Sequence, residues 1–471
     1  MMQECHSEVP TMGCIKTVNL LKSHLDSVTR FLSPLLPLVN CHMVEFLTEQ
    51  HWERLVPAGL RELIDGWELN EAVEKYWDIS MNPDNAEQNE LSSWILNARS
   101  QYVSVNNQYC LSVDQLKQRI CDWGGSILPE IQIKEFMSAK KSYEVQQMSS
   151  VCASLARAAG CAGALEAGGG RGPLLAALAL GYGLPSLTVD CDERLVRNAE
   201  KRVKIIQKQW HAISKKLGPS SAAPAPARLR FALAFITEHT PLADLFQEKF
   251  PEYAREDVRI LLTGLHPCGD LGASCLRALT SQRSLAAALT VPCCYHLLTE
   301  RAGGGFPMAH HMAGYSLGRN ARMLAAQSVQ RVVAARQMPA RSLLHRALLE
   351  AIIKEKLPNV RISEGKLKRV NSKCDETFDQ YLKEADAILN LRLFDSVSDS
   401  YLTDVKREMD GQWKKLVMFY LLRLCLAQVV ESVILLDRLL FMYESDFDKA
   451  FLVKIFDPVL SPRCHAIVAI K

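Results

Sequence analysis

A short glycine-rich stretch contains residue types that suit the binding of a nucleoside. Glu166 stands two positions before the first of three alternating glycines, Gly168, Gly170 and Gly172. Dinucleotide enzymes instead use Gly-x-Gly-x-x-Gly, which lets the backbone approach a pyrophosphate. The glycines here still allow close approach and positive φ, while the acid suits a ligand with an ammonium group. The pattern favours S-adenosylmethionine, which joins an ammonium group to an adenosine and has no phosphate.

A second carboxylate supports this interpretation. Residues Ser186–Asp190 read as the strand that follows, and Asp190 comes 18 residues after Gly172. At that spacing a carboxylate can accept hydrogen bonds from both hydroxyls of a ribose. A glycine-rich loop by itself is often an ordinary turn, so the predicted cofactor site depends on the strand, the loop, the following helix and Asp190 together.

Two clusters of cysteine and histidine occur at the ends of later apolar runs. The first lies at the end of residues 257–266 and the second at the end of residues 285–292. Both would face one crevice, because the carboxyl ends of parallel strands meet at the same edge of a sheet. The chemically active members are His266, Cys268, Asp270, Cys293, Cys294, Tyr295 and His296.

Three interpretations of these clusters remain open. In the first, His266 or Asp270 takes a proton from a methyl acceptor or orients it, Tyr295 borders the substrate, and the cysteines and His296 line its pocket. In the second, the three cysteines and a histidine bind a metal, although the clusters lack a Cys-x₂-Cys pair. In the third, the cysteines are small apolar residues packed at the strand ends. We favour the first for His266, Asp270 and Tyr295 and the third for most cysteines, and we expect no metal.

The elements that must position these residues form an α/β domain. Apolar runs alternate with helical segments, which predicts a doubly wound parallel sheet. The runs 451–456 and 464–470, separated by a turn-rich loop, predict an antiparallel hairpin. We therefore expect a seven-stranded Rossmann-like methyltransferase sheet that finishes with this hairpin. The helix before the first strand either brings Lys140, Lys141 and Glu144 to the site or exposes them to solvent.

The chain is expected to contain two domains. Tryptophans and helical periodicity in residues 1–136 predict an all-α N-terminal domain, and residues 137–471 form the methyltransferase domain with a helical insertion at about 307–443. Apolar residues 416–436 are interrupted by charges, so a buried core helix is favoured over a membrane span.

Composition and charge narrow the classes of partner and compartment. The 471 residues carry a net charge of +3, so no global basic field indicates nucleic-acid binding. A basic stretch at 354–373 is either a solvated loop or a patch that contacts phosphates, and residues 218–227 read as a linker. The 15 cysteines lack the spacing of a disulfide framework, and residues 1–30 lack a signal-peptide core. We therefore expect reduced thiols in the cytoplasm or the nucleus.

Four segments resemble the methyltransferase-like protein 25 family: 262–271, 293–298, 317–325 and 460–463. The resemblance runs from the N-terminal helices to the last residue. It is closest to the B-type branch, sometimes labelled "ribosomal RNA adenine dimethylase domain-containing". It implies an S-adenosylmethionine-dependent methyltransferase fold and leaves the substrate open.

Two departures from related patterns bear on the substrate. Glu166 and Gly169 stand where the family usually has Asp and Ser. Adenine-N6 enzymes carry an Asn/Asp-Pro-Pro-aromatic turn after the fourth strand, where this chain has residues 266–269, His-Pro-Cys-Gly, so adenine dimethylation is disfavoured. His-x-Cys-Gly with Cys-Cys-x-His is similar to a family of tRNA ribose 2′-O-methyltransferases, which favours RNA as the substrate. The alternatives are a protein methyltransferase and a catalytically silent scaffold or cofactor-sensing protein.

Overall fold

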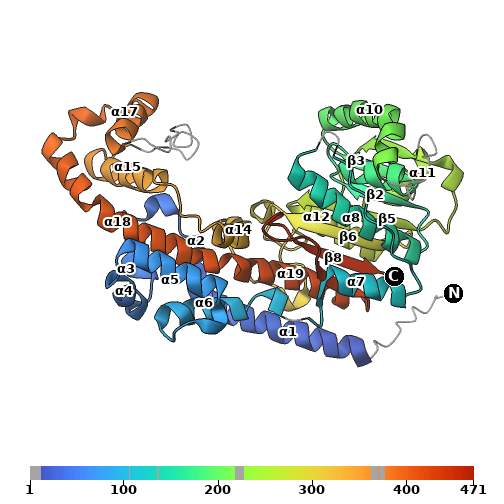
Figure 1. The fold of residues 1–471 in the computed structure, drawn as a ribbon, viewed down its shortest axis with the longest axis horizontal. Helices are drawn as coiled ribbons and strands as arrows, with labels where there is room; N and C mark the ends of the chain where they lie inside the picture. Colours follow the sequence, from blue (N-terminus) through green and yellow to red (C-terminus); the bar gives the residue numbers. More distant parts are fainter. Residues whose placement is uncertain are drawn as a thin grey trace. The chain divides into compact units, whose positions relative to one another are not determined.

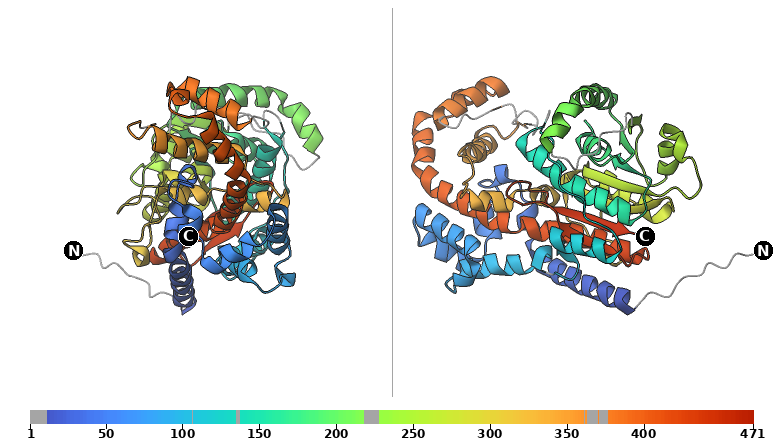
Figure 2. Two further views of the ribbon diagram at one scale, coloured as in Figure 1. Left: turned by 90° about the vertical axis from the view of Figure 1, so that its left-hand side faces the viewer. Right: turned by 45° about the vertical axis from the view of Figure 1, so that its right-hand side comes forward.

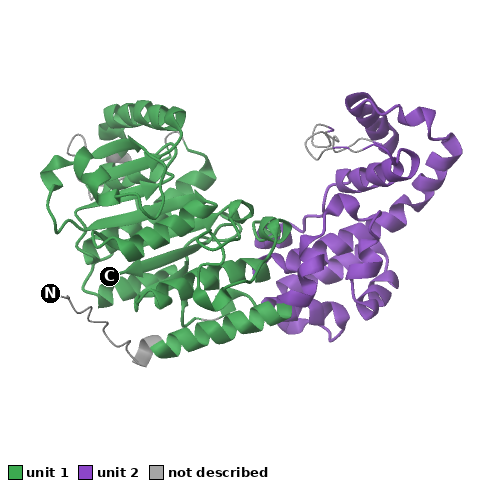
Figure 3. Ribbon diagram, turned by 180° about the vertical axis from the view of Figure 1, so that it is seen from behind, with its two compact units in different colours: residues 1–31, 101–328, 429–471 green, residues 32–100, 329–428 purple. Residues whose placement is uncertain are grey.

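The computed structural model describes residues 12–105, 107–134, 137–217, 228–360, 362, 370 and 377–471. The expected linker 218–227 lies outside these residues, as do positions 361, 363–369 and 371–373 of the basic stretch. The chain divides into two compact units, drawn in green and purple in Figure 3. Unit 1 comprises residues 1–31, 101–328 and 429–471, and unit 2 comprises residues 32–100 and 329–428. Each unit thus combines segments that are distant in sequence, and no unit boundary coincides with the expected one at residue 136.

Unit 1 is built on one eight-stranded sheet (Figure 1). The strands are β1 (Cys110–Ser112), β2 (Gly163–Ala167), β3 (Ser186–Asp190), β4 (Leu229–Leu233), β5 (Ile260–Cys268), β6 (Leu285–Cys293), β7 (Ala450–Lys454) and β8 (His465–Ile470). Their spatial order is β1-β7-β8-β6-β5-β2-β3-β4. Neighbouring strands are parallel except in the two pairs made by β8, which is antiparallel to β6 and to β7. The expected Rossmann-like methyltransferase sheet with a C-terminal hairpin is confirmed.

The strand count is one higher than expected because β1 joins the sheet. This strand pairs in parallel with β7, from Cys110 opposite Leu452 to Ser112 opposite Lys454. It has three residues, and the Ser112 side chain already caps the helix that follows by accepting a hydrogen bond from the Gln115 backbone N–H. So short a strand shows no alternating pattern, which is why the N-terminal region read as all-helical.

Helices pack on the sheet of unit 1 around one apolar core. The helices of this unit are α1 (Met12–Leu32), α7 (Val113–Asp122), α8 (Ala139–Ala158), α9 (Pro173–Ala176), α10 (Glu193–Leu217), α11 (Leu242–Lys249), α12 (Asp270–Ser281), α13 (Arg319–Leu324) and most of α19 (Ala427–Glu444). Residues of α7, α8, α9 and α10 share their core with alternate strand residues such as Ala287, Leu289 and Val291. Helix α12 packs on β5 and β6, and Figure 2 shows these helices lying along the strands.

Unit 2 is helical and is assembled from both of its chain segments. Its helices are α2 (Leu36–Asn40), α3 (His51–Leu55), α4 (Ala58–Asp65), α5 (Leu69–Met81), α6 (Glu90–Ser100), α14 (Val329–Ala334), α15 (Ser342–Lys356), α17 (Phe378–Leu389) and α18 (Asp399–Cys425). Hydrogen bonds join the segments: Trp94 Nε1 donates to the Leu422 carbonyl at 3.0 Å and Arg423 Nη2 donates to the Val39 carbonyl at 2.8 Å. The expected helical insertion therefore packs with the N-terminal helices.

One apolar stretch is long enough to cross a membrane. Asp399–Glu444, which contains α18 and α19, meets the criteria of length and composition, and 89% of its most apolar window is buried inside the protein. Core helices of globular proteins meet the same criteria. This burial supports the interpretation of residues 416–436 as a core helix.

Candidate functional site

The glycine loop after β2 has the backbone conformation that its sequence predicts. Gly168, Gly170 and Gly172 have φ values of 65°, 54° and 66°, a region that L-residues with a Cβ rarely adopt. The loop is closed by two backbone hydrogen bonds, from Gly168 N to the Val189 carbonyl at 2.9 Å and from Gly172 N to the Gly169 carbonyl at 2.8 Å. The expected strand–loop–helix unit is therefore present.

Asp190, the last residue of β3, is tied to this loop. Its Oδ2 accepts a hydrogen bond from Gly170 N at 2.9 Å, and its Oδ1 accepts one from Asp192 N at 3.0 Å. An ionised carboxylate has about four acceptor positions, so both oxygens keep capacity for further donors. The carboxylate is thus fixed at the edge of the sheet with acceptor capacity left for a ligand.

A cavity of about 630 Å³ opens at this edge of the sheet. Among the predicted site residues, those that line it are Gly168, Asp190, His266, Cys268 and Asp270. The predicted site residues that are not among its lining residues are Glu166, Gly170, Gly172, Cys293, Cys294, Tyr295 and His296. One cavity therefore joins the glycine loop and Asp190 to the first of the two cysteine- and histidine-rich corners.

The wall of the cavity formed by residues 234–238, which follow β4, was not predicted from the sequence. Strand β4 ends at Leu233, so the next five residues form a loop at the carboxyl edge. Within it, Phe235 keeps 75% of its surface exposed. The sequence did contain a signal for this wall, because the rule that places ligands at the carboxyl ends of parallel strands applies to β4 as well.

Phe235 is expected to provide a stacking face for the adenine of the expected ligand. The Phe235→Ala variant should bind S-adenosylmethionine about tenfold more weakly, because stacking a base on an aromatic ring contributes roughly 1–3 kcal/mol. Leu233→Ala is the matched control, since Leu233 is also exposed, at 55%, but does not line the cavity. Titration calorimetry of both variants measures the difference, and equal affinities would contradict this role.

Glu166 lies beneath the glycine loop rather than in the cavity wall. It is 2% exposed, and a Cβ built on Gly169 would lie 2.7 Å from Glu166 Oε2. Burial raises the pKa of this carboxyl to about 7, against the opposing effects of the Lys141 charge and of backbone hydrogen bonds. Glu166 is not among the residues that line the cavity, so its predicted contact with a ligand's ammonium group stays a prediction.

The raised pKa of Glu166 predicts a dependence of stability on pH. The folded chain holds this proton more tightly than the unfolded chain, so the stabilisation is complete below pH 4.5 and is lost as the pH rises through about 7. Glu166→Gln keeps a neutral side chain, so it should be more stable than the parent at pH 8, by up to about 3 kcal/mol, and lose this advantage at pH 5. Thermal unfolding at the two pH values tests this, and a pH-independent difference would refute it.

His266 is held by a buried carboxylate from α8. Its Nε2 lies 3.1 Å from Glu144 Oε1, and because a carboxylate only accepts, Nε2 carries the proton. Glu144 is 1% exposed and also accepts from the Ser461 hydroxyl at 2.6 Å, while Lys140 and Lys141 form ion pairs with it at 3.3 and 3.2 Å. The geometry therefore supports the expectation that helix α8 brings Glu144 to the site, rather than the alternative that this face is exposed to solvent.

The charge state of Glu144 follows from these neighbours. Burial raises the pKa of the Glu144 carboxyl, but the hydrogen bond and charge of His266, the Ser461 hydroxyl and the Lys141 charge outweigh it. The net pKa therefore lies below its usual value. The buried Nδ1 atom of His266 has no hydrogen-bond partner among the described residues.

Asp270 and Tyr295 hold neighbouring segments of the chain. Asp270, at the start of α12, accepts a hydrogen bond from Thr299 N at 2.7 Å through Oδ1 and so positions the loop after β6. Tyr295 is 1% exposed and its hydroxyl donates to Glu431 Oε1 of α19 at 2.9 Å. Its predicted place beside the substrate is not observed, because its hydroxyl is bound on the side of α19.

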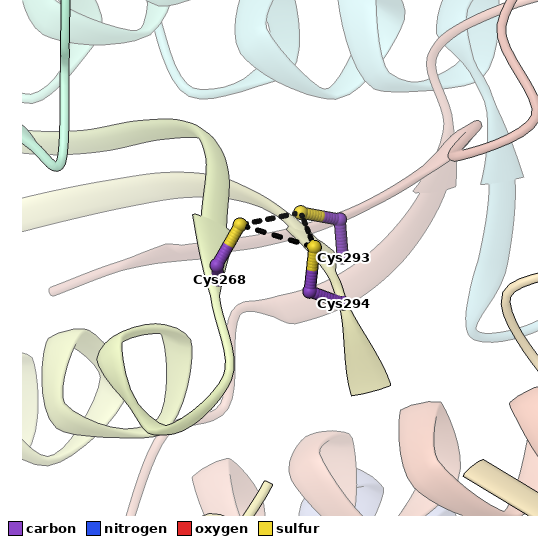
Figure 4. A group of neighbouring side chains, drawn as sticks. All are labelled: Cys268, Cys293 and Cys294. Carbon is purple, nitrogen blue, oxygen red and sulfur yellow. Dashed lines mark hydrogen bonds between the residues drawn. The ribbon is translucent and has the colours of Figure 1, made fainter. Parts of the chain in front are cut away.

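The three cysteines form one cluster at the ends of β5 and β6 (Figure 4). Their sulfur atoms lie 3.3 Å apart between Cys268 and Cys293, 3.2 Å between Cys268 and Cys294, and 3.6 Å between Cys293 and Cys294. The hydrogen bond from Cys293 is the main cause that lowers the pKa of Cys268 to about 6. His296, half-buried, has a buried Nδ1 without a hydrogen-bond partner among the described residues.

Comparison with known proteins identifies the kind of domain that carries these residues. Residues 140–301 match the model of a family described as a methyltransferase domain. The chain contains a methyltransferase domain. This domain includes the glycine loop, Asp190 and both cysteine- and histidine-rich corners.

The similarity to known methyltransferase-like proteins extends beyond this domain. The chain is 27% identical to "Probable methyltransferase-like protein 25" of Homo sapiens, over 96% of this chain and 97% of the human protein. It is 27% identical to the Mus musculus protein of the same name, over 96% of both. The resemblance to the methyltransferase-like protein 25 family is confirmed, while the assignment to its B-type branch stays a prediction. No solved structure matches the chain.

Proposed function

We propose that this chain transfers a methyl group from S-adenosylmethionine to an acceptor held beside His266. The observation that supports this most directly is the single cavity of about 630 Å³ that contains Gly168, Asp190 and His266 in its wall. Its volume lies within the range of roughly 300–1,000 Å³ that is typical of small-molecule sites.

The described residues fit the nucleoside part of this cofactor. Asp190 offers unused acceptor positions for ribose hydroxyls, and Phe235 offers an exposed aromatic face for a base. Gly168 lets the backbone come close, since a Cβ there would lie 2.7 Å from Leu271 Cδ2. When bound, S-adenosylmethionine supplies an electrophilic methyl group on a sulfonium. Glu166 is buried beside Gly169 of the glycine loop and does not line the cavity.

The acceptor is positioned by the first cysteine- and histidine-rich corner. His266 has a φ of 71°, which a residue with a Cβ rarely adopts, so the surrounding structure must hold it. The Glu144 carboxylate binds His266 through Nε2, so the imidazole ring is held in one orientation at the wall of the cavity, where it can border an acceptor. Positioning of this kind contributes most of the rate enhancement when two reactants must meet in line.

The acceptor class that we propose is RNA. Helix α10 begins three residues after Asp190 and exposes Lys201, Lys204 and Lys208, while Arg194 and Arg197 at its start form ion pairs with Asp192 and Glu193. Such a row of cations next to the cavity suits contacts with backbone phosphates. The described part of the basic stretch 354–373 is less suitable, because Lys354 and Lys356 form ion pairs with Glu49 and Glu355.

The rival functions are a protein methyltransferase and a silent scaffold that senses the cofactor. Two measurements on the full-length chain separate them. Titration calorimetry with S-adenosylmethionine tests binding, and transfer of a tritiated methyl group into total RNA and total protein fractions identifies the acceptor class. Lys201→Glu with Lys204→Glu serves as a variant for the RNA surface, because these two residues do not line the cavity.

Each outcome bears on one part of the proposal. Labelled RNA from the parent, with less label from the charge-reversed variant at equal cofactor affinity, is the expected result. Label found only in the protein fraction would show that the acceptor is a protein and not RNA. Cofactor binding without transfer to either fraction would favour the sensing scaffold. No binding at millimolar S-adenosylmethionine would overturn the enzymatic proposal.

A further inference from the structure

The cysteine cluster at the ends of β5 and β6 has the composition and geometry of a thiolate metal site. Its three sulfur atoms lie within 4.8 Å of one another. Sulfur atoms bound tetrahedrally to one Zn²⁺ at about 2.3 Å are roughly 3.8 Å apart. The observed separations of 3.2 to 3.6 Å would need to increase by only a few tenths of an ångström.

The backbone brings the three sulfur atoms together in an unusual way. Cys268 and Cys293 are paired in register on neighbouring strands, so their side chains point to the same side. Cys294 should then point to the opposite side, because successive residues of a strand alternate. Its φ of 45° breaks that alternation, and Figure 4 shows its sulfur beside those of Cys268 and Cys293. A residue with a Cβ held in this left-handed conformation is strained, and such strain is concentrated at functional sites.

Buried cations near the cluster suit a site with negative charge. Three thiolates and one Zn²⁺ carry a net charge of −1. Arg438 interacts electrostatically with Asp437 and, more weakly, with Cys293, and Arg463 interacts with Glu431 and, more weakly, with Cys293. Arg463 is also paired with Glu431 at 3.5 Å, but Arg438 is 1% exposed and its Nε and Nη2 have no hydrogen-bond partner among the described residues. A buried guanidinium with unsatisfied donors is stabilised by a nearby anionic site.

We propose that Cys268, Cys293 and Cys294 bind one Zn²⁺ ion through three thiolates at the wall of the cavity. Three Zn–S bonds form, three S–H bonds break, and three protons pass to solvent, with no change in oxidation state. A disulfide would join only two of the three cysteines and would need an oxidant. Among the residues that the structure describes, no histidine belongs to the group of ligand atoms within 4.8 Å, so the fourth position is taken by water or by the acceptor.

The location of Cys268 relates this metal site to the cavity. Cys268 is exposed and lines the cavity, whereas Cys293 is buried behind it. Three protein ligands with one exchangeable position are typical of catalytic zinc sites, while structural sites have four protein ligands. The metal would therefore be accessible from the cavity and could bind a nucleophilic group of the acceptor.

The test measures metal uptake in the absence of S-adenosylmethionine, so it is independent of methyl transfer. The full-length protein is stripped with a chelator under reducing conditions, reloaded with Zn²⁺ or Co²⁺, and analysed by elemental mass spectrometry and absorption spectroscopy. The variants are Cys268→Ser and Cys293→Ser, with Cys121→Ser as control. Cys121 is an exposed free thiol of α7 outside the cluster.

We expect the parent and Cys121→Ser to bind about one zinc per chain and to show the thiolate-to-cobalt charge-transfer band in the near ultraviolet. Cys268→Ser should weaken zinc binding at least about a hundredfold and reduce this band, with unchanged circular dichroism. Because Cys268 is exposed, its replacement tests the site even if Cys293→Ser fails to fold. The proposal would be overturned if the parent took up no more zinc than Cys268→Ser does. It would also be overturned if Cys268 formed a disulfide and reducing that disulfide restored no zinc uptake.

Discussion

Asp190→Ala should reduce the affinity for S-adenosylmethionine by at least about a hundredfold. The carboxylate is the expected acceptor for two ribose hydroxyls, and a hydrogen bond to a charged group contributes roughly 1.5–3 kcal/mol. It also accepts from Gly170 N and Asp192 N, so its loss releases the glycine loop that borders the cavity. Titration calorimetry measures the effect. Asp190→Asn keeps one acceptor oxygen, so its affinity for the cofactor should lie between those of Asp190→Ala and the parent.

Asp192→Ala is the matched control for this experiment. Its carboxylate accepts from Arg194 N at 2.8 Å at the start of α10 and does not line the cavity. This variant should lose a little helix stability and keep its cofactor affinity. If Asp190→Ala binds the cofactor as tightly as Asp192→Ala does, the assignment of the cofactor site is refuted.

Glu144→Ala should lower the free energy of unfolding by roughly 3–5 kcal/mol, which is typical when one partner of a buried ion pair is removed. It leaves the Ser461 hydroxyl and the buried side of His266 without their acceptor. Because His266 then loses its fixed orientation, methyl transfer should fall more than cofactor affinity does. Chemical denaturation and paired measurements of kcat and cofactor Kd test both effects.

The stabilisation by Glu144 should also depend on pH. Its pKa is lowered in the folded chain, so its contribution is present above pH 4.5 and is lost as the pH falls further. Glu144→Gln should therefore flatten the decline of stability in acid. Lys140→Ala is the control, because its side chain is 47% exposed and such pairs contribute at most about 1 kcal/mol. If the stability of Glu144→Gln fell with decreasing pH as steeply as that of the parent, the stabilising role of the ionised Glu144 would be contradicted.

The sequence predicted the parts of the site that depend on local geometry. Positive φ at Gly168, Gly170 and Gly172 could be read from glycine spacing, and Asp190 from its place at the end of an apolar run. The first follows from the missing Cβ of glycine and the second from the carboxyl-edge rule for parallel sheets, and each involves few residues in one stretch of chain. The hairpin β7–β8 was predicted for a similar reason.

The contacts between distant segments were not predictable in this way. Tyr295 was placed beside the substrate by its neighbours in sequence, but its hydroxyl donates to Glu431, 136 residues later. Glu166 was expected to reach the ligand, but it is buried and does not line the cavity. The sequence does not show on which side of a loop a carboxylate will lie. Ser461, which completes the environment of Glu144, comes from the loop before β8, and the family resemblance of residues 460–463 does not indicate this partner. Such pairings are set by packing, which periodicity does not encode.

The position of β8 between β6 and β7 has a consequence for synthesis on the ribosome. The five strands β2 to β6, with the cavity between residues 168 and 303, emerge from one continuous stretch, but residues 465–470 emerge much later. Until then β6 is an edge strand whose backbone at residues 287–290 lacks the partner it will have in the finished sheet. Unpaired apolar edges of this kind promote association between nascent chains. The half-built sheet therefore keeps an open edge until residues 465–470 have emerged and paired with β6.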